Sequence, residues 1–172
     1  MSSDRDRLAR VVCERAGALV LYARQWLPDA ASAEDAVQEA MTALLAQRRP
    51  PDDAVAWMFR AVRNAAIDQA RAASGRRRRE RAVAGGRREW FEPGTDALLD
   101  AQAAERALRH LPADSREIVV LRIWSGLGFA QIARVTGLGV STVHDRYVAA
   151  LDQLRHALEK PCPTITTTSP AE

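Results

Sequence analysis

Arginine side chains are concentrated in one segment of this sequence, where their chemistry is the recognition of anions. Residues 59–88 contain ten arginines and two acids, Asp68 and Glu80, a local balance of +8 in a chain whose formal net charge is +3. The rest of the chain is therefore net acidic. A basic segment in such a protein is typical of one that binds a polyanion, most often a nucleic acid. A solubilising arginine-rich linker is the competing interpretation.

Residue types that could support catalysis or metal binding are poorly placed. Glu34, Asp35 and Glu39 are close together, but no histidine forms the Glu-x-x-His pair that helical bundles use to bind metals. There is also no glycine-rich phosphate loop and no nucleophile beside a base. A helical enzyme with clustered carboxylates is thus the weakest functional class, and we expect no catalytic residue, metal or cofactor.

The composition indicates a helical protein of the cytoplasm. Apolar residues make up 47% of 172 residues, and alanine, leucine and arginine predominate over β-branched residues, which favours helices. Cys13 and Cys162 lie far apart without a Cys or His neighbour at metal-ligand spacing, which is typical of a reducing compartment. No apolar run reaches the length of a membrane span, and the N-terminus lacks a signal peptide's apolar core. We expect a cytoplasmic protein without membrane insertion.

Proline and glycine divide the first half of the chain into three expected helices. The first covers about residues 4–27 and ends at Pro28. The second begins after Ser32, the expected N-cap, and stops before Pro50. The third covers about residues 54–73 and ends at Ser74 and Gly75. No strand pattern or internal repeat is visible.

The second half predicts four short helices within residues 98–160, because breakers stand at Pro112, at residues 126–128 and at residues 137–139. The fold is therefore expected to be all-α, with one small domain over residues 1–84 and another over residues 98–160. Residues 85–97 lack periodicity and are the expected linker. Residues 161–172, rich in Thr and Pro, are expected to be a disordered tail.

The last helices carry a DNA-binding pattern. Residues 129–136 predict a short helix, Gly137 a left-handed turn, and Val140 the start of a longer helix. This is the helix-turn-helix pattern, whose second helix enters the major groove. With Val143 packed inward, the exposed residues near the start of that helix are Ser141, Thr142, His144, Asp145 and Arg146. A plain helical hairpin is the alternative interpretation.

Two further helices each have one polar face. After residue 33, helical spacing places Asp35, Gln38, Glu39 and Thr42 on one side, and Val37, Ala40, Met41, Leu44 and Leu45 on the buried side. In the next helix, Arg60, Asn64 and Arg71 lie along one line with Arg63 beside it, while Met58, Phe59, Val62 and Ala66 face the core. A basic stripe with an amide suits phosphate contacts and the reading of an exposed base. Trp57 is either a core anchor or a contact to such a base.

Four blocks of the sequence resemble parts of bacterial sigma factors. Residues 111–122 (LPADSREIVVLR) and 126–133 (GLGFAQIA) resemble region 4, and residues 33–39 (AEDAVQE) and 56–68 (AWMFRAVRNAAID) resemble region 2. Their order and the short linker resemble the minimal two-domain extracytoplasmic-function (ECF) group, over about residues 8–158. The resemblance implies a region 2-like helical bundle and a region 4-like helix-turn-helix domain.

The resemblance also implies partners and site residues. Core RNA polymerase would dock on Asp35, Gln38 and Glu39, and promoter DNA would be opened at its minus-ten element, where the loop over residues 48–54 would help to capture an unstacked base. The implied minus-ten residues are Arg60, Arg63, Asn64, Arg71, Arg76, Arg77, Arg78 and Arg79. The implied minus-thirty-five residues are Ser141, Thr142, His144 and Arg146. An anti-sigma protein is a further partner that the sequence leaves open.

The recognition helix departs from the family's usual pattern. Arg146 is its only fixed positive charge before Arg155, and Gly128 and Gly139 stand where a capping serine is common. Weak binding to the minus-thirty-five element, or an unusual target sequence, is expected. A stand-alone helix-turn-helix regulator without polymerase docking is the alternative function, and a pull-down of core polymerase separates the two.

Overall fold

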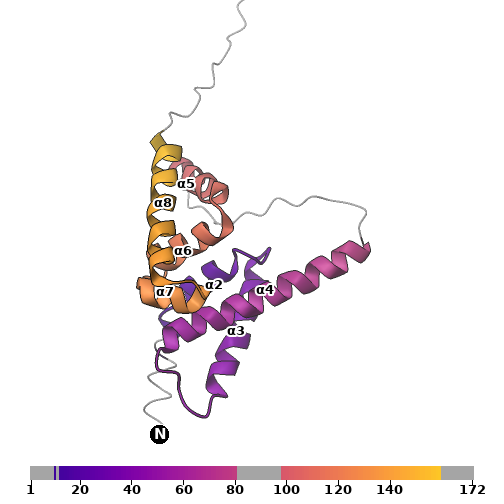
Figure 1. Cartoon of the computed structure of the whole chain (residues 1–172). Coiled ribbons are helices and arrows are strands. Elements are labelled where there is room, and N and C mark those ends of the chain that lie inside the picture. Colours follow the sequence, from indigo (N-terminus) through magenta and orange to yellow (C-terminus); the bar gives the residue numbers. More distant parts are fainter. Residues whose placement is uncertain (1–9, 11, 81–97, 160–172) are drawn as a thin grey trace, which may run out of the picture.

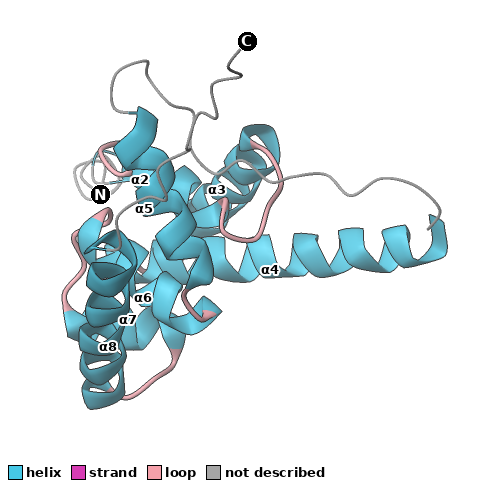
Figure 2. Cartoon of the chain, turned by 90° about the horizontal axis from the view of Figure 1, so that it is seen from above, coloured by secondary structure: helices cyan, strands magenta, loops and turns pink. Residues whose placement is uncertain are grey.

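The computed structural model describes residues 10, 12–80 and 98–159, and their regular structure is entirely α-helical (Figures 1 and 2). The expected all-α class is confirmed over these residues. The helices form two units in chain order. The first unit contains α2 (Ala16–Ala23), α3 (Ala30–Leu45) and α4 (Ala54–Glu80), and the second contains α5 (Leu98–His110), α6 (Ala113–Ile123), α7 (Phe129–Thr136) and α8 (Val140–Glu159).

The core of the first unit lies where α3 packs against both α2 and α4. Four residues of α4 at helical spacing are at most 1% exposed, as their periodicity predicted: Met58, Phe59, Val62 and Ala66. Tyr22 of α2 packs edge-on against Phe59, with 5.4 Å between the ring centroids. These apolar contacts fix the direction in which the polar face of α4 points.

The first helix is shorter than predicted. Instead of one helix over residues 4–27, an N-terminal helical segment ends at Cys13, a turn follows at Glu14 and Arg15, and α2 covers only Ala16–Ala23. Gly17 lies just after the turn, and glycine has a lower helix propensity than any other residue except proline, which favours a break near this position. Residues 1–9 and 11 lie outside the described part of the chain.

The N-cap of α3 was also mispredicted. Asp29, not Ser32, caps the helix, and its Oδ1 accepts a hydrogen bond from the Ser32 backbone N–H at 2.8 Å. An aspartate in extended backbone conformation can reach the free N–H groups of the first turn, and its charge also suits the helix dipole. These hydrogen bonds from Ser32 lower the pKa of the Asp29 carboxyl.

Helix α4 begins at Ala54 as predicted but does not end at Ala73. It continues through Ser74 and Gly75 to Glu80, so that its last turns extend away from the other helices (Figures 1 and 2). A single glycine costs a helix only about 1 kcal/mol, and the arginines that follow are good helix formers. The arginine run therefore prolongs the helix that the glycine was expected to stop.

The breaks of the second unit fall where the sequence predicted them. Gly126 and Gly137 have φ angles of 66° and 78°, and the latter ends α7 with its N–H donating to the Ala133 carbonyl at 2.8 Å. Helix α8 packs against α5, α6 and α7. The expected linker over residues 85–97 and the expected tail over residues 161–172 lie outside the described residues.

The two units also contact each other. Helix α7 packs against α4, and α6 contacts α2. One continuous cluster of buried apolar residues joins the cores of both units, from Leu19 and Phe59 to Ile118 and Ile132. Figure 1 shows the result, with α7 lying across the N-terminal end of α4.

Candidate polymerase and nucleic-acid interfaces

The predicted polymerase-docking residues lie on the exposed face of α3. Asp35, Gln38 and Glu39 are all exposed, while Val37, Ala40 and Leu44 on the opposite face are buried. Met41 is half-buried. Leu45 was predicted to be buried but is 51% exposed. It is the last residue of α3 and lies past the end of the buried face. The face offers two carboxylates and an amide to a partner.

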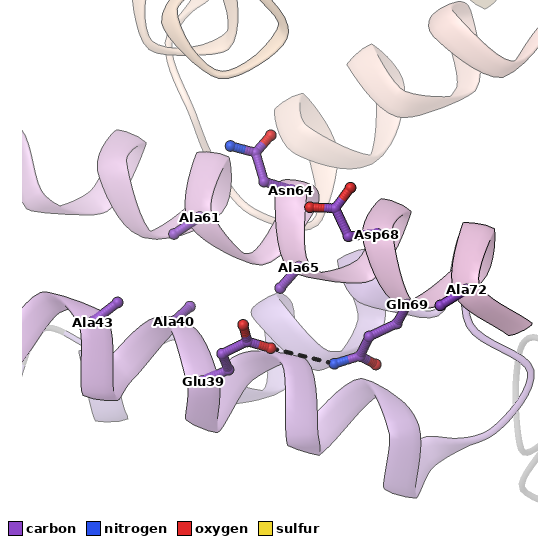
Figure 3. Close-up of a pocket in the computed structure, with 9 residues that line it drawn as sticks. All are labelled: Glu39, Ala40, Ala43, Ala61, Asn64, Ala65, Asp68, Gln69 and Ala72. Carbon is purple, nitrogen blue, oxygen red and sulfur yellow. Dashed lines mark hydrogen bonds between the residues drawn. The ribbon is translucent and has the colours of Figure 1, made fainter.

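A groove of about 440 Å³ continues this face between α3 and α4 (Figure 3). Alanines from both helices form its walls, and its polar residues are Glu39, Asn64, Asp68 and Gln69. Gln69 Nε2 donates to Glu39 Oε2 at 3.5 Å, which bridges the groove. Two carboxylates disfavour a phosphate at this place, so the groove suits a basic or neutral group instead.

The line of Arg60, Asn64 and Arg71 on α4 is exposed, as predicted. Asn64 points away from α3 (Figure 3). The sequence showed Asp68 within the basic segment but did not connect it with this line: Asp68 lies 3.7 Å from Arg71, with both side chains at least 75% exposed, so the pair is weak. Arg76, Arg77, Arg78 and Arg79 follow on the last turns of α4.

Arg63 faces the second unit. Its Nε lies 2.7 Å from Glu117 Oε1 of α6, and the two side chains are 26% and 5% exposed. The Tyr22 hydroxyl donates to the same carboxylate oxygen at 2.5 Å. Hydrogen bonding to Glu117 raises the pKa of Arg63, and burial raises the pKa of Tyr22. Glu117 was not singled out from the sequence, because helix periodicity carries no information about partners 54 and 95 positions away.

The loop before α4 is held by α7. Asp53 caps α4 through the Ala56 N–H at 3.0 Å, accepts from Gln131 Nε2 at 3.0 Å, and lies 2.9 Å from Arg134 Nη2. Burial alone would raise the pKa of the Asp53 carboxyl, but these hydrogen bonds and the guanidinium outweigh it and the pKa is lowered. Trp57, in the first turns of α4, packs half-buried against the core.

The helix-turn-helix has the predicted geometry. Val143 is fully buried, Ser141 and His144 are exposed, and Thr142 is half-exposed. The rings of His144 and Phe129 of α7 meet edge-on at 5.3 Å. Arg146 lies 2.7 Å from Asp114 of α6, an acid that the sequence analysis did not connect with it. The single cation at the start of the recognition helix is thus already paired.

Within the described residues, no group of three or more His, Cys, Asp and Glu side chains could hold a metal ion. No helix of the described part of the chain combines the length and the apolar character of a membrane span.

Known sequence families match both units. Residues 14–76 match Sigma-70 region 2, and residues 101–154 match Sigma-70, region 4. The ECF RNA polymerase sigma factor SigL of Mycobacterium tuberculosis is 34% identical over 154 residues, covering 86% of each chain. The RNA polymerase sigma-H factor of Pseudomonas aeruginosa is 30% identical over 151 residues, covering 78% of this chain and 77% of that protein.

Solved structures share the fold. The sigma factor RpoE of Bartonella quintana, in complex with the anti-sigma factor NepR, superposes with a TM-score of 0.70 at 23% identity over 94% of this chain and 100% of that one. CnrH, in complex with the cytosolic domain of CnrY, gives a TM-score of 0.65 at 24% identity over 94% and 93%. With regions 2 and 4 in order, the chain belongs to the ECF group of the sigma-70 family, whose members are transcription initiation factors that direct RNA polymerase to promoters.

Proposed function

We propose that three surfaces of this sigma factor divide its work. The exposed face of α3 docks on core RNA polymerase, α4 with the loop before it reads and helps to melt the minus-ten element, and the start of α8 reads the minus-thirty-five element. The observation that carries this proposal is the presence, in one chain, of a helix-turn-helix and of a second helical unit with an exposed acidic face and an exposed basic line.

The docking surface consists of Asp35, Gln38 and Glu39 with the adjoining groove. Its alanine walls and its carboxylates complement a partner helix that carries arginine or lysine on an apolar stem. Electrostatic complementarity of this kind accelerates association and fixes orientation.

The minus-ten surface combines sequence-independent and base-selective contacts. Arg60, Arg63, Arg71 and the run from Arg76 to Arg79 supply phosphate contacts, and the Asn64 amide supplies donor and acceptor groups for one unstacked base. Taking a base out of the stack costs a few kcal/mol, so binding the extruded base favours strand opening.

The minus-thirty-five surface consists of Ser141, Thr142, His144 and Arg146. Three of these four side chains carry no fixed charge, and Arg146 is paired with Asp114, so its contribution to phosphate binding is small. We expect the upstream element to contribute less affinity than the minus-ten element.

The domains, the compartment and the remaining partner follow from this role. We place the polymerase-docking and minus-ten domain at residues 1–84 and the minus-thirty-five domain at residues 98–160. We propose a cytoplasmic protein, because core polymerase and promoter DNA are found in that compartment. An anti-sigma protein is a further expected partner, since the similar sigma factor RpoE was solved in complex with the anti-sigma factor NepR.

Run-off transcription tests the whole proposal. Purified protein is added to core polymerase with a library of genomic fragments, and we expect transcripts from a small subset of promoters. A pull-down with core polymerase accompanies it. Promoter binding without retention of polymerase would favour a stand-alone helix-turn-helix regulator.

A further inference from the structure

An acid stands on the solvent side of the recognition helix. Helix α8 packs against the rest of its unit through Val143, Tyr147 and Ala150, which are buried or half-buried. Asp145 follows Val143 by two positions, which places it about 200° around the helix, on the opposite side. Its side chain is 81% exposed. Asp145 is the sixth residue of α8, so it belongs to the N-terminal part with which a recognition helix contacts base edges.

Asp145 is also the dominant charge of this surface. The exposed residues at the start of α8 are Val140, Ser141, His144, Asp145, Val148 and Ala149. Among these six side chains, only that of Asp145 carries a fixed charge. Whatever lies against the start of α8 therefore meets a carboxylate with uncharged neighbours on its own helix face.

The neighbouring cations leave part of this carboxylate free. Arg146 Nη1 lies 2.7 Å from Asp114 of α6 and so is paired elsewhere. Within the described residues, the only basic group within 4 Å of the Asp145 carboxylate is the His144 ring, whose Nδ1 lies 3.5 Å from Oδ1. That ring packs edge-on against Phe129 of α7 at 5.3 Å. The second oxygen of Asp145, Oδ2, can therefore accept from a ligand.

A carboxylate in the major groove distinguishes bases by the groups that they present. It accepts hydrogen bonds and donates none, and cytosine offers it the N4 amino group. Guanine and thymine present acceptor oxygens, which a carboxylate repels. Adenine presents its N6 amino group beside the N7 acceptor, a pair that suits an amide better than a carboxylate. Asp145 therefore favours cytosine over the other three bases.

The same charge lowers the affinity for DNA of every other sequence. Phosphates repel a carboxylate, and Arg146, paired with Asp114, compensates for little of this repulsion. A cytosine that donates to Asp145 offsets the cost only where the sequence places it correctly. Specificity then comes from a repulsive element as well as from an attractive one. The expected result is a weak upstream contact that depends strongly on one base.

We propose that Asp145 is a specificity-determining residue of the minus-thirty-five surface and that it accepts a hydrogen bond from the N4 amino group of one cytosine in the upstream element. This inference rests on the proposed function, which assigns the start of α8 to that element. It adds the acid to the four residues of the minus-thirty-five surface and states which base the acid selects.

A selection by the assembled holoenzyme tests the assignment. The full chain with core polymerase is mixed with fragments of a promoter found by run-off transcription, in which about 10 base pairs, one turn of the upstream duplex, are randomised. Bound fragments are sequenced. We expect the parent to enrich one cytosine, and Asp145→Ala to reduce the preference for cytosine at that position by about 5-fold to 150-fold.

An isosteric change tests the chemistry of the contact. Asp145→Asn replaces one acceptor with a donor, and an amide pairs with N6 and N7 of adenine. We expect the preferred base at the same position to change from cytosine to adenine. Asp152→Asn, about two turns later on the same side of α8 and 56% exposed, makes the same charge change and is the matched control. Its cytosine preference should equal that of the parent, and melting curves verify that all variants are folded.

The possible failures are distinguishable. Asp145→Ala with higher affinity for all fragments and an unchanged base preference would mean that the acid only repels DNA, which overturns the inference but leaves upstream reading by α8 intact. Retention of cytosine by Asp145→Asn, or loss of the cytosine preference in Asp152→Asn, overturns it as well. If a parent holoenzyme that transcribes enriches no upstream base at all, the minus-thirty-five role of α8 in the proposed function is overturned together with the inference.

Discussion

Acidic residues determine how many of the arginines of this chain are available to DNA. The sequence shows where arginines are concentrated, but it does not show which of them are paired with acids. Four arginines on α4, α7 and α8 have a carboxylate within 4 Å: Arg63 with Glu117, Arg71 with Asp68, Arg134 with Asp53, and Arg146 with Asp114. Of these acids, only Asp68 belongs to the basic segment. A charge count along the sequence therefore overestimates the positive surface that a promoter meets.

The pairing of Arg146 predicts that removing its acid strengthens DNA binding. Both side chains are partly exposed, at 38% and 65%, and exposed pairs contribute about 0.2–1 kcal/mol. Asp114→Asn should therefore raise affinity for duplex carrying the upstream element by about 1.5-fold to 5-fold in gel-shift titrations. Arg146→Ala should abolish that gain when the two changes are combined. A gain that persists in the double variant would mean that Asp114 repels DNA directly.

The α3 face predicts a loss of polymerase binding without a loss of stability. Asp35→Lys/Glu39→Lys reverses two exposed charges, and surface changes usually alter stability by no more than about 0.5 kcal/mol. Affinity for core polymerase should fall to background in a pull-down or interferometry assay, with an unchanged melting curve. Glu34→Lys, an exposed acid beside this face, is the control. Retained affinity in the double variant would remove this face from the docking surface.

At the scale of helices, local chemistry predicted the boundaries of the second unit well, those of the first unit poorly and long-range contacts not at all. Gly137 marks the end of α7 because its φ of 78° is unfavourable for other residues, and this preference can be read from sequence. The ends of α2 and α4 depend on small differences in helix propensity between neighbouring residues, so the prediction from sequence misplaced them. The Gln131–Asp53 contact joins positions 78 apart, and nothing local to either residue encodes it.

Two glycines predict stability changes of opposite sign. A Cβ at either Gly17 or Gly137 would meet no atom within 4 Å, so backbone conformation decides the outcome. Gly17→Ala lies within α2 and should stabilise by about 0.5–1 kcal/mol. Gly137→Ala must hold a left-handed φ and should destabilise by about 1–2 kcal/mol. Urea titrations measure both, and equal effects would contradict the assigned turn.

The extension of α4 predicts how the arginine run contributes to binding. If Arg76 to Arg79 contact phosphates, replacing all four with alanine should weaken binding to every promoter alike. Each lost contact should reduce the log–log salt slope by about 0.9 on duplex DNA or about 0.7 on single strands. Alanine preserves the helix, so circular dichroism should not change. An unchanged slope would indicate that the run is only a solvated extension of α4.

For the whole molecule, the family matches divide the chain into two domains, whereas the contacts between the units join these domains. Regions 2 and 4 match as separate families over residues 14–76 and 101–154. In the structure, however, the two units are joined by one apolar cluster and by the polar contacts of Glu117, Asp53 and Arg15. The chain therefore has the sequence organisation of two domains and the packing of a single cooperative body.

This packing predicts that the free protein unfolds as one unit. Because Tyr22 and Arg63 of the first unit share the buried Glu117 of the second, unfolding either unit exposes groups of the other. Calorimetry should give one transition whose calorimetric and van't Hoff enthalpies agree, the standard criterion of two-state behaviour. Glu117→Gln should weaken the coupling and separate two transitions, whereas Asp152→Asn, at an exposed residue of α8 that pairs with Arg155 of the same helix, should not. Two resolved transitions in the unaltered protein would mean that the contacts between the units add too little to couple them, and a single transition in both variants would mean that the apolar cluster holds the units together without Glu117.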